Sequence, residues 1–383
     1  MNKRVSAQPR HTTTGTSPSL PETPHLGPVL DEEQNRESFG SHELAIILSH
    51  YQLNVIEQIQ ELPIGSRHSP KVLIRTQEGN YLLKRRASGR DDPYRVAFAH
   101  HLMLHLASQN FPVPRLFGTR ENNNSMVQFV GRSYELFEYV AGERYDRSAP
   151  AAYQAGATLA RLHDILSSWH YKYKPPSGSY HASKEIDAKL SVIPAMVDAV
   201  TPDLDNQALS RTCDYLSHMY WQAAEKVNQC GYGALAVVIL HGDWHPGNLL
   251  FRNEGVNAVL DFDSARYEPR IADLANAALQ FSMKMSTTEN VTVWPEGLEI
   301  SLLASVVKGY DEQAETSLTS EELEALPWLI IEALITESVL PIAATGSFAH
   351  LDGATFLEMI GRKIKWIAPR AAKLTAYLKG QQR

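Results

Sequence analysis

Asp243, Asn248 and Asp261 are polar residues whose types and spacing could support chemistry. Asp243 and Asn248 stand five positions apart in a loop that contains proline and glycine, and Asp261 follows Asn248 after thirteen residues. Large apolar and β-branched residues cluster before and between them, which predicts that each polar residue lies at a strand end. A hairpin turn would bring the three side chains together. The expected strands are 236–240, 249–251 and 257–260, with the turn at 253–255.

This set of side chains has the composition of a phosphoryl-transfer site. In phosphoryl transfer the protein mostly positions the reactants and compensates charge, using a carboxylate for the proton of the attacking hydroxyl and oxygen ligands for Mg²⁺. Mg²⁺ usually takes only one or two protein carboxylates, and water and phosphate complete its shell. Asn248 and Asp261 suit the metal and Asp243 suits the proton. Their D-x-x-x-x-N spacing and later aspartate match the catalytic loop and metal site of protein kinases.

The whole string around these residues is more specific than the spacing alone. The signature of the aminoglycoside phosphotransferase-like kinases, a set that includes choline and homoserine kinases, closely resembles two strings here, His241-Gly-Asp-Trp-His-Pro-Gly-Asn248 and Leu260-Asp-Phe-Asp263. The resemblance implies that ATP is the phosphate donor and Asp243 the catalytic base. It also implies that Asn248 and Asp261 bind Mg²⁺. The same resemblance implies that His241, His245 and Asp263 support the catalytic and metal-binding residues.

Two plainer explanations stay open for these residues. The aspartates could be turn formers, and His241 and His245 could mark a metal site of another kind. A zinc site is the weaker of these explanations, because the only two cysteines, Cys213 and Cys230, lack C-x-x-C spacing and lie apart from the histidines in the sequence.

A small antiparallel sheet is expected upstream of this region, because three runs of strand-forming residues follow one another there. Lys84 lies on the third run, where kinase-like folds carry the lysine that binds the α- and β-phosphates. A solvated lysine at a strand end is the alternative. The segment 63–70 is the place for a loop that covers the nucleotide. The expected strands are 55–60, 71–76 and 80–85.

One residue of the kinase pattern is missing. Kinases pair this lysine with a glutamate on the following helix, and Asp92 with the proline after it predicts the start of that helix. No glutamate occurs in 79–120. Either another acceptor holds Lys84 or this part of the fold is organised differently. His100 and His101 are interpreted as surface or packing residues.

Two more strand-like runs, 125–130 and 132–140, end just before Gly142. In the order of elements that kinases share, this is the connection between the two lobes. The adenine would meet the backbone from Glu138 to Val140. Backbone contacts leave no side-chain signature, so this expectation rests on chain order and on the resemblance.

The chain beyond Gly142 has the periodicity of helices. The element R-x-x-D-L-A that contains Asp273 also resembles these kinases, in which the aspartate supports the catalytic loop by hydrogen bonds. Capping of the next helix explains Asp273 equally well. The acceptor would be held by the late helices. The expected helices are 151–166, 187–200, 206–227 and most of 298–378, with breaks at Pro327, Pro341 and Gly346.

Composition bounds the class of protein. The chain has 383 residues, 43% hydrophobic and 21% charged, which is enough for two core-bearing units. A net charge of −7 and a pI near 6.1 oppose nucleic-acid binding. Two cysteines and no secretory signal predict a reducing, cytoplasmic location. The most apolar stretch, 326–344, contains Glu332 and Glu337 and is expected to be a buried helix rather than a membrane span.

These observations predict an α+β, two-lobed protein-kinase-like fold. A disordered tail is expected at 1–40, since its composition cannot bury enough apolar surface. An N-terminal nucleotide-binding lobe at 41–140 would hold a five-stranded antiparallel sheet and one main helix. The mainly helical C-terminal lobe at 141–383 would hold the catalytic and acceptor-binding residues.

The predicted function is ATP- and Mg²⁺-dependent transfer of phosphate to a hydroxyl of a small polar metabolite. Homoserine, choline, an amino sugar and an aminoglycoside are all admissible acceptors by the resemblance, and a protein serine or threonine is a further variant. The rival of another class is a nucleotide-binding pseudokinase that acts as a scaffold or regulator. The missing helix glutamate supports this rival, whereas the intact Asp243, Asn248 and Asp261 oppose it.

Overall fold

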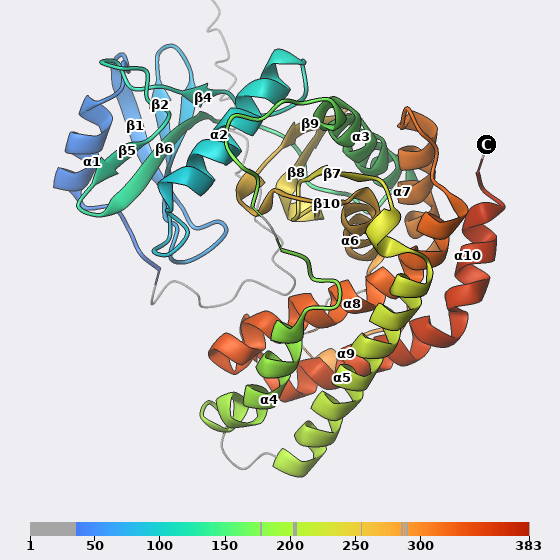
Figure 1. The fold of residues 1–383 in the computed structure, drawn as a ribbon. Helices are drawn as coiled ribbons and strands as arrows, with labels where there is room; N and C mark the ends of the chain where they lie inside the picture. Colours follow the sequence, from blue (N-terminus) through green and yellow to red (C-terminus); the bar gives the residue numbers. More distant parts are fainter. Residues whose placement is uncertain are drawn as a thin grey trace, which may run out of the picture.

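The computed structural model describes residues 36–176, 178–201, 205–253, 255–284, 286, 288 and 290–382. Most of the predicted tail at 1–40 therefore lies outside the described residues. Figure 1 shows a sheet part at the upper left and a larger helical part, with helix α2 between them. An N-terminal antiparallel sheet followed by a mainly helical region confirms the predicted α+β fold class.

The N-terminal part is built on an antiparallel sheet of six strands in the order β1-β2-β3-β6-β4, with β5 paired to β6. The strand bounds are Ile56–Leu62 (β1), Lys71–Thr76 (β2), Asn80–Arg85 (β3), Leu116–Phe117 (β4), Val127–Phe129 (β5) and Arg132–Glu138 (β6). The prediction of five strands is wrong by one, β4. Two residues are too few to show an alternating pattern.

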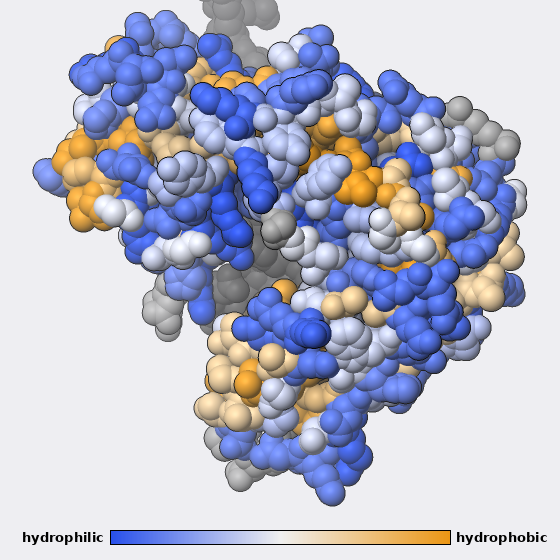
Figure 2. Space-filling view, viewed as in Figure 1, coloured by the Kyte–Doolittle hydropathy of each residue, from blue (hydrophilic) through white to orange (hydrophobic). Residues whose placement is uncertain are grey.

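Helix α1, Ser41–Ser49, packs on one face of this sheet. Alternate residues of the central strands, among them Val72 and Leu83, are buried against Ile47 of the helix. Because strand neighbours point to opposite faces, Lys84 next to Leu83 points away from α1. On the side seen in Figure 2, apolar atoms gather beside α1, and most of the remaining surface is hydrophilic.

Helix α2, Pro93–Ser108, joins the sheet to the helical part. Its N-cap is Asp92, whose carboxylate accepts the N–H of Arg95 at 2.9 Å, and proline occupies the first helical position. Phe98 and Leu102 of α2 are buried in the large core that continues through the helical part. Helix α2 is therefore fixed on the far side of the sheet from α1.

Within the residues that the structure describes, eight further helices form the C-terminal part and share this core. Two short antiparallel pairs, β7 with β10 and the hairpin of β8 with β9, lie between α5 and α6 in the chain. The connections between these strands contain the polar residues of the sequence signature. The helices are Ala149–Ser167 (α3), Lys184–Asp198 (α4), Asn206–Gln229 (α5), Arg270–Ser282 (α6), Ile300–Gln313 (α7), Ser320–Thr345 (α8), Gly353–Ile367 (α9) and Ala371–Lys379 (α10). The short strands are Val237–Leu240 (β7), Leu249–Arg252 (β8), Gly255–Val259 (β9) and Arg266–Pro269 (β10).

Helix α8 is continuous although Pro327 and Pro341 lie inside it. The predicted breaks at these prolines are therefore wrong, whereas the break at Gly346 is correct, since this residue ends the helix in the left-handed conformation with φ of 78°. A proline leaves the carbonyl four residues earlier without its N–H partner. For Pro327 that carbonyl belongs to Leu323, and it accepts the hydroxyl of Thr375 on α10 at 3.3 Å. A neighbouring helix thus replaces the lost hydrogen bond.

Among the described residues, α8 is also the one helix long and apolar enough to cross a membrane by length and composition. However, 78% of its most apolar window is buried inside the protein. Its Glu332 is buried and lies 2.8 Å from the ring nitrogen Nδ1 of His181. This is the burial of a core helix.

Helices α3 and α7 approach each other at two glycines, which generates a stability prediction. A Cβ atom on Gly309 would overlap the backbone oxygen of Tyr153, and one on Gly156 would overlap that of Val306. We expect Gly309→Ala to lower the free energy of unfolding by about 1–3 kcal/mol in urea denaturation, because the helices must separate. Gly79→Ala is the control, since nothing lies within 4 Å of its added atom. Equal losses in both variants would contradict the close-packing explanation.

Candidate active site

Asp243 and Asn248 lie in the loop between β7 and β8, and their side chains are in contact. The side-chain nitrogen Nδ2 of Asn248 donates to the backbone oxygen of Asp243 at 2.9 Å and to its carboxylate at 3.1 Å. Asp261 directly follows Leu260, whose N–H donates to the carbonyl of Asn248 at 2.8 Å. The hairpin of β8 and β9 thus brings Asp261 back beside the loop that carries the other two residues.

The donor set of Asn248 and Asp261 fits Mg²⁺. Because Asn248 contacts Asp243 through its nitrogen, its side-chain oxygen is not used there. The Asp261 side chain is 43% exposed, and its backbone has a left-handed φ of 61°. Amide and carboxylate oxygens are ligands that Mg²⁺ accepts. A zinc centre is not supported, since the described part of the chain has no group of three or more His, Cys, Asp or Glu that could hold a metal.

The two histidines of the loop have different surroundings. Nδ1 of the buried His241 accepts the N–H of Asp243 at 3.3 Å, and its Nε2 lies 2.9 Å from the carbonyl of Leu260. These contacts place the ring proton on Nε2, and burial lowers the pKa of His241. His245 accepts the N–H of Gly247 through Nδ1 at 3.0 Å, so its Nε2–H faces the Asp243 carboxylate at 3.6 Å.

The charge state of Asp243 follows from these neighbours. Burial on its own would raise the pKa of Asp243, but the hydrogen bond and the charge of His245 hold it below its ordinary value. The side chain is therefore a carboxylate at neutral pH. This is the form that can accept a proton.

Asp273 supports the start of the same loop. Its carboxylate accepts the backbone N–H groups of His241 at 2.7 Å and Gly242 at 2.9 Å, and it lies 3.3 Å from Nε2 of His163. Burial would raise the pKa of Asp273, but the hydrogen bond and charge of His163 lower it. Helix α6 begins after Pro269 and no side chain caps it. Of the two explanations for Asp273 that the sequence left open, the contacts favour support of the loop.

Lys84 links the sheet to the segment after β9. Its Nζ lies 3.0 Å from Asp263 and 3.5 Å from Asp261, and Arg86 donates to the other oxygen of Asp263 at 2.6 Å. Burial on its own would lower the pKa of Lys84, but the two aspartates raise it above its ordinary value. The Lys84 side chain is only 12% exposed, so it is not a solvated lysine at a strand end.

The glutamate that α2 lacks has a counterpart on strand β6. Glu135 is fully buried and lies directly opposite Lys84 in the pairing of β3 with β6. Its carboxylate accepts Nε of Arg86 at 2.8 Å and lies 2.6 Å from Nε2 of His100. His100, interpreted as a surface or packing residue, is buried and bonded to this carboxylate from α2. An acid therefore lies beside Lys84, on a strand instead of a helix.

Glu138 and Val140 stand where the chain leaves the sheet. The N–H of Glu138 donates to the carbonyl of Arg115 at 2.8 Å, and the N–H of Tyr139 donates to that of Asn80 at 2.9 Å. No backbone hydrogen bond of Val140 is found within the described ranges. Among the described residues, the backbone N–H and carbonyl of Val140 form no hydrogen bond and could therefore meet the adenine, as predicted. The N–H of Glu138 is already bonded to Arg115.

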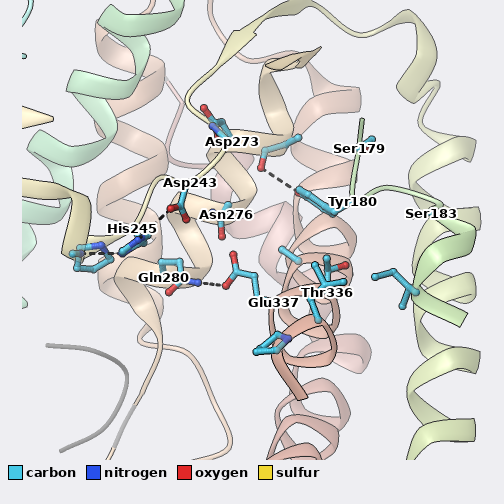
Figure 3. A pocket seen from close by; sticks show the side chains of 18 of the residues that line it. Ser179, Tyr180, Ser183, Asp243, His245, Asp273, Asn276, Gln280, Thr336 and Glu337 are labelled. Atoms are coloured by element: carbon cyan, nitrogen blue, oxygen red, sulfur yellow. Dashed lines mark hydrogen bonds and ion pairs between the residues drawn. The ribbon is translucent and has the colours of Figure 1, made fainter. Parts of the chain in front are cut away.

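A cavity of about 890 Å³ opens beside Asp243. Its walls come from the loop between β7 and β8, from α6 and α8, and from the segment 179–186 before and within the first turn of α4. Figure 3 shows Asp243, Asn276, Gln280 and Glu337 around the same opening. The late helices therefore contribute α8 to the expected acceptor site, together with segments that the sequence did not indicate.

Glu337 projects from α8 into this cavity. Its carboxyl group accepts the side-chain amide of Gln280, and within the described ranges it forms no ion pair with a lysine or arginine. Burial and the nearby charge of Asp243 raise the pKa of Glu337 to about 8. His245 is a nearby charge that acts in the opposite direction. A carboxyl group at a cavity wall that forms no ion pair with a lysine or arginine of the described residues suits a cationic ligand.

Sequence reasoning did not single out Arg86, Glu135 or Glu337 as site residues. Alternation along β3 gave the face of Lys84, but the pairing of β3 with β6 joins segments far apart in the chain, which no local period reveals. Glu337 was noticed only as a charge that interrupts an apolar stretch. That interruption was the available signal, since a carboxyl group on a buried helix needs a partner.

Known proteins resemble this chain in sequence. The sequence model of the APH phosphotransferase enzyme family matches residues 59–318. A homoserine kinase of Chelativorans sp. (strain BNC1) is 25% identical over 294 residues, which cover 76% of this chain and 81% of that protein.

Two solved structures share the fold. An aminoglycoside phosphotransferase from Alicyclobacillus acidocaldarius subsp. acidocaldarius DSM 446 has a TM-score of 0.61 at 17% identity and covers 91% of this chain and 98% of its own. The amicoumacin kinase hAmiN, in complex with AMP-PNP, Ca²⁺ and Ami, has a TM-score of 0.61 at 15% identity and covers 89% of this chain and 94% of its own. These likenesses confirm the predicted protein-kinase-like fold.

The contacts of Asp273 generate a second stability prediction. We expect Asp273→Ala to lower the free energy of unfolding by about 3–5 kcal/mol, because it removes one member of a buried charged group and leaves two loop N–H groups without an acceptor. Denaturant titration followed by circular dichroism measures the loss. Asp214→Ala, at an exposed position of α5, is the control. A loss no larger than that of the control would contradict the supporting role.

Proposed function

The chain belongs to the APH phosphotransferase family, whose members phosphorylate hydroxyl groups of small molecules, and from this premise we propose that it transfers the γ-phosphate of ATP to a small amino alcohol. The proposal makes Asp243 the catalytic base, Asn248 and Asp261 the Mg²⁺ ligands, and Lys84 the phosphate-binding lysine. The observation that carries it is the position of Asp243, a deprotonated carboxylate on the wall of a cavity of about 890 Å³.

The proposed step is an in-line displacement. The acceptor hydroxyl gives its proton to the Asp243 carboxylate while its oxygen forms a bond to the γ-phosphorus. The bond from that phosphorus to the bridging oxygen of ADP breaks, and the electron pair leaves with ADP. A positioned base contributes about 10²–10⁴-fold to such a rate. His245, whose Nε2–H faces Asp243 at 3.6 Å, stabilises its deprotonated form before each turnover.

The nucleotide and metal assignments have support from the fold and from the donor set. The likeness to a kinase structure that contains AMP-PNP and Ca²⁺ supports an ATP donor with a divalent cation. Asn248 and Asp261 would hold Mg²⁺, which neutralises charge on the phosphate oxygens when bound. Lys84 would contact the α- and β-phosphates, and the free backbone groups of Val140 would meet the adenine.

Glu337 supports an acceptor that carries a cationic amine. An ammonium group beside this carboxyl would supply the positive charge that no lysine or arginine of the described ranges supplies. Homoserine and amino sugars carry a primary ammonium that can also donate hydrogen bonds, so they are the first acceptors to test. Choline is the comparator, since its quaternary ammonium cannot donate and is recognised mainly by aromatic faces.

Two alternative functions, a nucleotide-binding scaffold and a protein serine or threonine kinase, have less support from this site. A nucleotide-binding scaffold was favoured by the glutamate missing from α2, but Glu135 places an acid opposite Lys84 on β6. A protein serine or threonine as acceptor has less support, since the cavity beside Asp243 is within the range of about 300–1,000 Å³ typical of small-molecule sites. Incubation with ATP and a panel of alcohols separates these functions. Binding of ATP without turnover on any acceptor would favour the scaffold.

The role of Asp243 gives a direct test. We expect Asp243→Asn to lower the transfer rate by about 10²–10⁴-fold or more, because the amide cannot accept the hydroxyl proton. The affinity for ATP, measured by calorimetry, should stay within a few-fold of wild type. Asp214→Asn on α5 is the matched control and should keep the wild-type rate. An unchanged rate in Asp243→Asn would defeat the assignment.

The role of Glu337 predicts a pH dependence. Its pKa is about 8 in the free protein, so below pH 8 the carboxyl must lose its proton before it can pair with an ammonium. The affinity for a cationic acceptor should therefore rise with pH by up to about tenfold per unit and level off above the pKa. KM for the acceptor between pH 6.5 and 8.5 measures this. In Glu337→Gln the affinity should be weak and flat with pH; a wild-type profile in that variant would refute the pairing.

A further inference from the structure

Glu135 carries a buried carboxylate oxygen that has no hydrogen-bond partner. The side chain has 0% exposed surface, and Oε1 receives both Arg86, at 2.8 Å, and His100, at 2.6 Å. Oε2 is without a partner among the described residues. Most buried polar atoms in folded proteins have a hydrogen-bond partner. An unpaired buried carboxylate oxygen therefore indicates that a hydrogen-bond donor reaches it in another state of the protein.

Lys84 is placed to be that group. It stands directly opposite Glu135 in the antiparallel pairing of β3 with β6, so the two Cβ atoms are about 4.5–5.5 Å apart on one face of the sheet. The charge of Glu135 is among those that raise the pKa of Lys84. In this structure Nζ instead contacts Asp261 at 3.5 Å and Asp263 at 3.0 Å.

The proposed function, on which this inference rests, makes two demands on those contacts. Asp261 is needed as a metal ligand, and Lys84 must meet the phosphates of the nucleotide. When Asp261 turns to a cation, Lys84 loses one of its two carboxylate partners. Helix α2 cannot replace it, because the side chain that α2 sends to this place is His100, which is itself bonded to Glu135.

We infer that Glu135 is the positioning residue of Lys84 in the nucleotide-bound protein. Nζ of Lys84 donates to Oε2 of Glu135 there, while Arg86 and His100 fix the carboxylate through Oε1. The acid of the lysine–glutamate pair thus stands on strand β6 in this chain. His100 connects α2 to this pair through its hydrogen bond to Glu135. A glutamate on α2 would make the connection by contacting Lys84 itself.

Glu135→Gln tests the inference, because it keeps the shape of the side chain and removes its charge. We expect the transfer rate kcat to fall about 10–100-fold, the size of effect found when outer-shell partners of metal ligands are removed. KM for the acceptor should stay within about twofold of wild type, since Glu135 does not line the acceptor cavity. Glu61→Gln, at an exposed position of β1 in the same sheet, should keep the wild-type kcat. A wild-type kcat in Glu135→Gln would overturn the inference.

Moving the carboxylate to the helix separates positioning from mere structural support. In the Glu135→Gln background, His100→Glu returns an acid to the same place from α2, because the His100 ring lies 2.6 Å from the Glu135 carboxylate. We expect this double variant to recover most of the lost kcat. His100→Gln in that background is the uncharged match and should recover none. Equal kcat values in the two double variants would count against a charge that positions Lys84.

A structure of the wild-type protein with AMP-PNP decides the question if Glu135→Gln does not fold. Nζ of Lys84 within about 3 Å of Oε2 of Glu135 supports the inference, and an Oε2 that Lys84 does not reach overturns it. Calorimetry of the wild type with ATP comes first. Absence of ATP binding would defeat the proposed function and the inference with it, whereas ATP binding with normal turnover by Glu135→Gln would defeat the inference alone.

Discussion

The ion pairs that Asp263 forms with Lys84 and Arg86 are the constraint on which the site depends. They join strand β3 and the residue after it to the segment that follows β9, so the sheet part and the helical part meet through charges. These charges are largely removed from water, and removing one member would leave the others uncompensated. The nucleotide side of the site is therefore set by the same contacts that hold the two parts together.

A second series of contacts holds the loop between β7 and β8 from the opposite side. The carboxylate of Asp273 accepts two loop N–H groups and meets His163 of α3, whose other ring nitrogen lies 2.7 Å from the hydroxyl of Tyr310 on α7. Helices α3 and α7 are themselves drawn together at Gly156 and Gly309. The position of the loop that carries Asp243 thus depends on the packing of α3 against α7.

The sequence was sufficient where chemistry and local period agree. The signature around Asp243, with strands on both sides of it, predicted the loop, the hairpin and the arrangement of Asn248 and Asp261 beside it. Prediction from the sequence failed where contacts with a distant segment of the chain determine the local structure. The unbroken course of α8 through Pro327 depends on a hydroxyl from α10, and the acid beside Lys84 depends on a strand pairing. Neither leaves a trace in the residues nearby.

The hydroxyl of Thr375 bridges α10 to α8, the helix that also lines the cavity beside Asp243. Lys379, one turn after Thr375, forms an ion pair with Glu324 at 2.6 Å. Helix α10 therefore contacts the first turns of α8 through two side chains. Thr336 and Glu337 lie farther along α8 and line the cavity. Substitutions that remove the Thr375 or Lys379 contact are therefore expected to disturb the helix that also forms one wall of the cavity.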